Sequence, residues 1–108
     1  MQRKAQAALK EGRTVWLPCE VKGGMFPTER YIQLFVPDVT VPISGFVPSE
    51  DVRDPKSPEE RTGQVRAVIA HLAKDEAALL FRGEILSATN PVIVPSKWIL
   101  ATTNVADR

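Results

Sequence analysis

The tripeptide Val-Pro-Ser occurs twice in this chain, as Val47–Ser49 and as Val94–Ser96. The two copies lie 47 positions apart, and apolar residues follow each of them. A recurrence with a period of about 20–50 residues is typical of a repeated supersecondary unit. At the same offset Ile32 falls opposite Leu79, so the hydrophobic pattern agrees with the repeat. The spacing predicts two similar halves, which limits the fold to one that a short unit can build twice.

Three segments carry the pattern of β-strands. Apolar residues alternate with polar ones over residues 13–22, and residues 30–36 are rich in aromatic and β-branched side chains. Residues 92–94 are a third β-branched run, which leads into the second Val-Pro-Ser. A period of two residues is typical of a half-buried strand. Because Pro18 has no N–H to donate, we expect its strand to lie at a sheet edge or to carry a bulge.

Residues 58–74 admit two interpretations. Ser57, Pro58 and Glu60 make a good helix start, and the apolar residues that follow recur at helical spacing. Gly63 and the β-branched residues oppose a helix, because glycine costs about 1 kcal/mol in a helix interior and β-branched side chains lose rotamer freedom there. The competing interpretation is a strand over 64–72 that pairs with a second strand over 77–82. We therefore predict a mainly β fold, with an α+β fold and a helix at about 58–74 as the alternative.

Composition divides the chain into five parts of one compact domain. The first part has apolar residues at helical spacing and Gly12 where a C-cap is expected, which predicts a short N-terminal helix or arm. Prolines and acidic residues are concentrated after Pro48 and indicate a linker between the halves. The predicted parts are an N-terminal helix or arm at 1–12, a first β unit at 13–53, a linker at 54–63, a second β unit at 64–101 and a tail at 102–108.

The segment around the first Val-Pro-Ser has a family resemblance. Gly45, Phe46, Val47, Pro48 and Ser49, with the residues up to position 52, form a pattern of glycine, hydrophobic residue, proline and serine. This pattern resembles the last-strand signature of SH3-type small barrels, in which a short helical turn follows. The resemblance implies an SH3-like barrel topology, here as a tandem of two units. The chain lacks the paired tryptophans and the acidic loop of peptide-binding SH3 domains, so recognition of proline-rich peptides is not implied.

Length and charge exclude several classes. A chain of 108 residues with 44% hydrophobic and 25% charged residues is typical of one globular domain. Its apolar runs are far shorter than the ~20 residues that span a bilayer, so we expect no membrane insertion. Fourteen basic and thirteen acidic residues give a net charge of +1, which removes the strongest general argument for a nucleic-acid partner. A lone cysteine and an N-terminus without a signal-peptide pattern predict a cytoplasmic protein.

No catalytic or metal-binding motif stands out in the sequence. His71 is the only histidine and lies in an apolar segment, and Cys19 alternates with the apolar side of its strand. A catalytic triad needs three roles in one geometry, and a metal site needs ligands at a recognised spacing. Cys19 is therefore expected in the core. We predict a protein that is not an enzyme and has no catalytic residues, metal or cofactor.

The candidate binding residues are basic and aromatic. An N-terminal basic cluster is offset by one acidic residue within the first thirteen positions, and an arm of this kind can lie on phosphate. Three aromatic residues can supply stacking surfaces beside it. The candidates are Arg3, Lys4, Lys10, Arg13, Trp16, Tyr31 and Trp98. They favour a nucleic-acid-associated small barrel. The alternatives are a protein-interaction or self-assembling subunit, a homo-oligomer built through strand edges, and third an enzyme of unknown type.

Overall fold

The computed structural model describes residues 9–24, 26–37, 39–57, 60 and 62–106. Strands dominate the described chain, so the prediction of a mainly β protein is confirmed. The elements in order are β1 (Thr14–Gly23), β2 (Glu29–Leu34), β3 (Ile43–Pro48), the 3₁₀ turn η2 (Ser49–Asp51), β4 (Val52–Arg53), β5 (Thr62–Leu72), β6 (Glu76–Leu80), β7 (Glu84–Ile85), β8 (Val92–Pro95) and the helix α1 (Ser96–Ala106).

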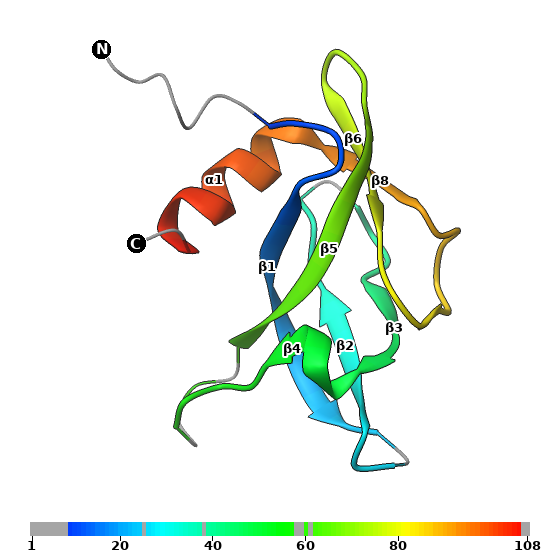
Figure 1. Cartoon of the computed structure of the whole chain (residues 1–108), viewed down its shortest axis with the longest axis vertical. Coiled ribbons are helices and arrows are strands. Elements are labelled where there is room, and N and C mark those ends of the chain that lie inside the picture. The colour runs from blue at the N-terminus through cyan, green and yellow to red at the C-terminus, as the bar shows by residue number, and fades with distance from the viewer. Residues whose placement is uncertain (1–8, 25, 38, 58–59, 61, 107–108) are drawn as a thin grey trace.

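All strands belong to one antiparallel sheet, which curls into a half-barrel (Figure 1). The strand order is β7-β3-β2-β1-β5-β6-β8, and the short β4 pairs with β5 off this path. β1 and β5 lie at the centre and pair over seven residue pairs, from Thr14↔Val68 to Glu20↔Thr62. The long central pair therefore joins two three-stranded meanders, β1-β2-β3 and β5-β6-β8.

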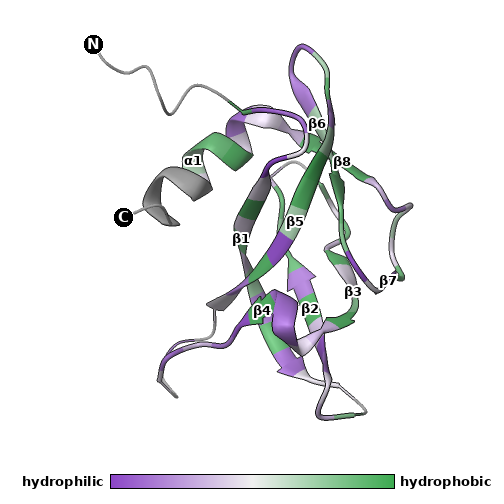
Figure 2. Ribbon diagram, in the orientation of Figure 1, coloured by the Kyte–Doolittle hydropathy of each residue, from purple (hydrophilic) through white to green (hydrophobic). Residues whose placement is uncertain are grey.

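The core lies on the concave side of the sheet. Every second residue of the central strands is buried, and hydrophobic and hydrophilic residues alternate along β5 in Figure 2. This follows from the two-residue repeat of a strand, which sends successive side chains to opposite faces. Fully buried members of the core are Leu17, Ile32, Leu34, Val65, Ile69, Leu79 and Ile99.

The alternative helix at 58–74 is wrong, because residues 62–72 form β5. Val65 and Ile69 are both fully buried in the sheet, and burial of β-branched side chains in a sheet outweighs local helix propensity. Gly63 contributes as well. A Cβ at this position would collide with the carbonyl oxygen of Arg53, so only glycine lets the end of β4 approach β5 this closely.

The predicted N-terminal helix is not found where the chain is described. Residues 1–8 of the predicted 1–12 segment lie outside the described residues, and Glu11 and Gly12 form a turn. Gly12 has a φ of 86°, in the region that glycine adopts readily, and its N–H donates to the carbonyl of Ile69 at 2.7 Å. Among the described residues the α-helix is C-terminal. Residues 102–106, predicted as part of a tail, continue α1.

Pro18 was predicted at a sheet edge or a bulge, and it lies instead in the central strand β1. The carbonyl of Arg13 accepts the N–H of Ile69, so odd-numbered residues of β1 face β5 and Pro18 faces the β2 side. On that side β1 pairs only from Glu20 to Gly23. The ring nitrogen of Pro18 therefore lies where the neighbouring strand has already ended, which is why a proline is tolerated there.

Both Val-Pro-Ser copies perform the same local task. Each proline ends a strand, β3 or β8, and each serine begins a helical segment, η2 or α1. The N–H of Ser49 donates to the carbonyl of Thr28 at 2.8 Å, and the N–H of Ser96 donates to the carbonyl of Asp75 at 2.9 Å. A serine at the start of a helical segment commonly caps the segment with its hydroxyl group. The two serine hydroxyls of this chain do not. η2 has no side-chain cap, and the buried Ser96 Oγ has no hydrogen-bond partner among the described residues.

Candidate functional site

The outer, convex side of the central strands carries a group of charged and aromatic side chains. Trp16 of β1 is paired with Arg66 of β5, so both side chains project from the same face, away from the core. Arg53 of β4 is paired with Gln64, one pleat along β5 on this same face. We call Trp16, Arg53, Arg66 and Arg82 the arginine–tryptophan face.

Arg53 stacks on Trp16. The guanidinium carbon of Arg53 lies 3.8 Å from the centroid of the Trp16 ring, and Arg53 Nη1 donates to Gln64 Oε1 at 3.2 Å. A guanidinium over an indole is attracted by the electron-rich ring face, by about 0.5–1 kcal/mol at an exposed site. The contact holds the guanidinium plane against the indole. Arg53 is nevertheless exposed, so its guanidinium group remains accessible from solvent.

A buried carboxylate holds the other two arginines. Asp51 lies in η2 with only 2% of its side chain exposed, and its Oδ1 is 3.4 Å from Nη1 of both Arg66 and Arg82. Glu50 Oε2 is 3.0 Å from the same nitrogen of Arg82. Side-chain exposure of 40% for Arg66 and 58% for Arg82 shows that both guanidinium groups still reach solvent. Asp51 therefore fixes the two cations at the surface without covering them.

The face is suited to flat or anionic ligands. The face carries three guanidinium groups, two of which pair with the exposed Glu50 and the buried Asp51. In the hydrogen bonds to Asp51, Arg66 and Arg82 each donate through Nη1. A guanidinium has five N–H donors in a planar fork, which matches phosphate oxygens and stacks on rings. The face thus combines a stacking surface with donors for an anion.

The predicted basic residues are only partly described. Arg3 and Lys4 lie outside the described residues. Lys10 and Arg13 are exposed and immediately precede β1, the strand that carries Trp16. Arg13 lies three positions before Trp16, about 10 Å along an extended chain. By strand alternation Arg13 falls on the side of Val15 and Leu17, so it does not belong to the arginine–tryptophan face.

The three predicted aromatic residues do not share a surface. Trp16 lies on the convex side, as its polar alternation partners suggest. Tyr31 lies on the same side of the sheet but on β2, with its ring 5.2 Å from that of Phe46 at an angle of 56°. Trp98 belongs to α1 and packs against the core, on the opposite side of the sheet from Trp16. Only Trp16 is placed among cations.

Sequence reasoning missed the three arginines of the face and Asp51. Alternation in β5 places Arg66 on a polar face once that segment is read as a strand, so this one signal was present. Arg53 is the last residue of the predicted first β unit and Arg82 the last residue of the predicted strand 77–82, and periodicity gives little information at such ends. Asp51 is acidic, a residue type that is almost never buried unless it is paired.

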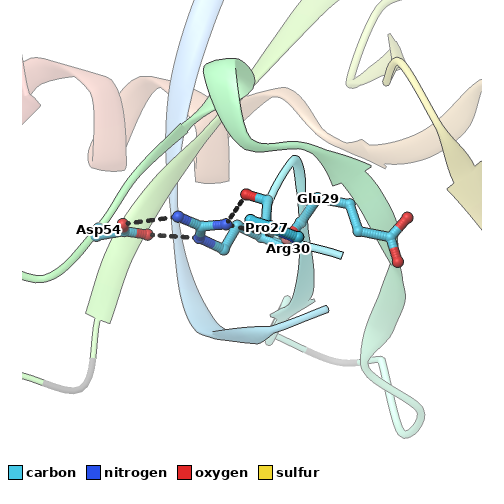
Figure 3. Close-up of polar contacts among 4 residues, drawn as sticks. All are labelled: Pro27, Glu29, Arg30 and Asp54. Carbon is cyan, nitrogen blue, oxygen red and sulfur yellow. Dashed lines mark hydrogen bonds and ion pairs between the residues drawn. The ribbon is translucent and has the colours of Figure 1, made fainter. Parts of the chain in front are cut away.

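An ion pair closes one end of the half-barrel. Figure 3 shows Arg30 of β2 reaching Asp54, with Nε to Oδ1 at 3.3 Å, while Nη1 donates to the carbonyl of Pro27 at 2.9 Å.

Cys19 is buried beneath this region, as predicted. Burial, and to a smaller extent the charge of Asp54, raise the pKa of the Cys19 thiol from 9.0 to about 12. A thiol with this pKa stays protonated at neutral pH, so Cys19 is a core residue.

The described residues show no arrangement of side chains typical of a catalytic site. His71 Nδ1 lies 3.1 Å from Glu11 Oε2, and both side chains are more than half exposed. No cluster of three or more His, Cys, Asp or Glu side chains in the described part of the chain could hold a metal ion.

An open hollow of about 470 Å³ lies between the β5–β6 turn and the start of α1. Its lining residues are Lys74, Asp75, Glu76, Pro95, Ser96, Lys97 and Leu100.

Comparison of the chain with protein-family models, with characterised proteins and with solved structures finds no match. None of the helices in the described ranges combines the length and apolar character required to cross a membrane.

Proposed function

We propose that this protein is a non-enzymatic binding module for single-stranded nucleic acid. The observation that carries the proposal is the stack of Arg53 on Trp16, with the exposed guanidinium of Arg66 beside it. Proteins that bind single strands combine aromatic or arginine planes, on which bases stack, with cations that contact the phosphates. A lone cysteine supports the cytoplasmic location that the proposal includes.

In this proposal each residue has a separate role. A base stacks on the free side of the Arg53 plane, which Trp16 supports from behind. Arg66 and Arg82 donate to phosphate oxygens with the N–H groups that Asp51 does not use. Lys10 and Arg13 add positive charge just before β1, and Arg3 and Lys4 precede them in the sequence. The small net charge of +1 predicts modest affinity with a limited number of phosphate contacts.

The scaffold in this proposal is a duplicated SH3-like barrel. The pair Ile32↔Gly45 between β2 and β3 recurs 47 positions further along as Leu79↔Val92 between β6 and β8. Two matching hydrogen bonds, from Ser49 to Thr28 and from Ser96 to Asp75, recur at the same offset. The run of strand, 3₁₀ turn and short strand over residues 43–53 supports the resemblance to SH3-type barrels. A strand-strand-strand-turn unit used twice accounts for the repeated tripeptide.

Anisotropy titration of a fluorescent single-stranded oligonucleotide tests the proposed function. We expect saturable binding at low salt that weakens as salt rises, because counterions leave the phosphates on binding. Replacing Arg66 by Gln should reduce the logarithmic salt slope by about 0.7, the share of one phosphate contact on a single strand. Trp16→Leu should weaken binding about tenfold, within the range for loss of one stacked base.

Lys74→Gln is the matched control for that titration. Lys74 is an exposed cation in the β5–β6 turn and makes none of the contacts of the arginine–tryptophan face. It should leave the affinity and the salt slope close to those of the parent protein. Absence of binding at low salt, or equal losses in Lys74→Gln and Arg66→Gln, would contradict the proposal.

Self-association through a strand edge is a second candidate function. The observation that favours it is the outer edge of β8, which closes the sheet order without a further strand in the described chain. Exposed strand edges are templates for pairing with another chain. A net charge close to zero gives little repulsion between two copies.

A further inference from the structure

Uncharged apolar side chains lie beside the arginine–tryptophan face on the convex side of the sheet. Leu80 is 44% exposed and Ile93 of β8 is 56% exposed. Val68 of β5 is paired with Leu80, and Ala78 is paired with Ile93, so these four side chains share one side of the sheet. We call them the apolar strip. Because polar residues are expected on the solvent side of an antiparallel sheet, apolar ones there point to an interaction surface.

The apolar strip continues the arginine–tryptophan face. On β5, Val68 lies two positions after Arg66, and the residue between them faces the core, so both side chains project on the convex side. Arg82 lies two positions after Leu80, and the residue between these two is also buried. Two members of the strip are therefore each next to an arginine of the face.

The stack of Arg53 on Trp16 lies close to the beginning of the strip. Trp16 is paired with Arg66, two residues before Val68. Arg53 is paired with Gln64, which lies two residues earlier still. At about 3.3 Å per residue, the stack and the strip are about 7–13 Å apart along β5. Since neighbouring nucleotides of a stacked strand are about 3.4 Å apart, the face and the strip together are long enough for several nucleotides.

We infer that the apolar strip binds the bases that follow the one stacked on Arg53, so the site holds a single strand of several nucleotides. The strand passes over Arg66 and Arg82, which contact its phosphates, and its next bases lie against Leu80 and Ile93. The side chains of the strip have no hydrogen-bonding groups, so they contact the faces of the bases and do not read their edges. The ligand class is therefore single-stranded nucleic acid of any sequence. This extension rests on the proposed function.

The distribution of charge favours a single strand as the occupant of the strip. Unpaired bases are flat groups joined by phosphates, which matches an apolar platform with arginines along one end. Pockets that receive flipped bases likewise use apolar as well as aromatic side chains to hold them. At the other end of the strip on β6 lies the exposed Glu76, whose carboxylate repels phosphate. The phosphates are thereby kept on the arginine side.

Oligonucleotides of two lengths separate the strip from the face. Leu80 lies two strands from Trp16 and Ile93 lies three strands away, about 10 and 14 Å across the sheet. A thymidine dinucleotide stacked on Arg53 does not reach them, whereas a thymidine octanucleotide does. In anisotropy titrations, Leu80→Ser and Ile93→Ser should each weaken binding of the octanucleotide about threefold to tenfold and leave binding of the dinucleotide unchanged.

Phe26→Ser is the matched control, since Phe26 is 59% exposed and lies in the β1–β2 loop, outside both the face and the strip. It should leave both affinities unchanged. If Leu80→Ser and Ile93→Ser bind the octanucleotide as well as the parent protein does, the strip serves another partner and the inference is overturned, while the proposed function stands. Equal losses for the two lengths would also overturn it. A parent protein that binds neither oligonucleotide would refute the proposed function and this extension with it.

Discussion

Replacement of Asp51 by Asn should have opposite effects on stability and on nucleic-acid affinity. Asp51 is almost fully buried and lies 3.4 Å from one nitrogen each of Arg66 and Arg82. Asparagine keeps the shape and one acceptor oxygen but removes the negative charge. Because both guanidinium groups remain partly in solvent, no charge is left buried and unpaired. The loss of stability should therefore be about 1–2 kcal/mol, well below the value for breaking a fully buried pair.

The same change removes one negative charge from the arginine–tryptophan face. At a distance of about 6 Å in a medium close to water, one unit charge contributes about 0.7 kcal/mol, or about threefold in affinity for an anion. We therefore expect Asp51→Asn to bind single-stranded oligonucleotide about threefold more tightly at low salt, with the gain disappearing as salt is added. Urea unfolding measures the first effect, and anisotropy titration measures the second.

Glu50→Gln is the matched variant. Glu50 pairs with Arg82 at 3.0 Å but its side chain is 70% exposed, so its loss should leave stability within about 0.5 kcal/mol while raising affinity to a similar extent. A purely structural role for the arginines gives a different pattern. If Asp51→Asn lowers stability while both variants bind oligonucleotide no better than the parent protein, the reasoning about this face is refuted.

Three further predictions concern the scaffold. Above pH 9 the free energy of unfolding should fall by about 1.4 kcal/mol per pH unit relative to Cys19→Ala. The thiol of the unfolded protein has the ordinary pKa of 9.0 and loses its proton in this range. The folded thiol, whose pKa is raised to about 12, keeps its proton. Urea unfolding of both proteins between pH 8 and pH 11 measures this, and parallel pH profiles would contradict it. Ser49→Ala and Ser96→Ala should each change stability by no more than about 0.5 kcal/mol, because neither hydroxyl caps its turn; a larger loss on thermal unfolding would mean that a hydroxyl is bonded after all. Gly45→Ala should lower stability by about 1–3 kcal/mol, since the added methyl group overlaps Glu84 of β7, and an unchanged urea midpoint would show that β7 does not occupy that place.

Strand positions were predictable wherever one face of a strand is buried. Alternation identified β1 and the aromatic run identified β2, because the same periodicity that is visible in the sequence determines which side chains reach the core. β5 was ambiguous, since Val65 and Ile69 fit both a strand and a helical stripe. Only the pairing with β1 decides between the two, and that pairing involves residues some fifty positions away.

The helix and the site depended on tertiary structure. α1 begins at Ser96 and continues through threonines, which favour helices weakly, and Ile99 within it is fully buried in the core. Packing of the apolar side of α1 against the core therefore stabilises the helix, which its local propensity alone would not do. The arginine–tryptophan face unites β1, β4, β5 and the segment after β6, so its composition follows from strand pairing. The position of Trp16 on the convex side was predictable from its polar neighbours, but its partner Arg53 was not.

The fluorescence of Trp16 tests the central claim most directly. The chain has two tryptophans, and a Trp98→Phe variant leaves Trp16 as the only one. If a base stacks on the Trp16–Arg53 pair, addition of single-stranded oligonucleotide should change Trp16 emission, and the titration should give the same dissociation constant as anisotropy. Trp16→Phe, in which Trp98 reports from the core side, should bind more weakly and show little change in emission. Binding by anisotropy with unchanged Trp16 emission would place the contact elsewhere and contradict the account.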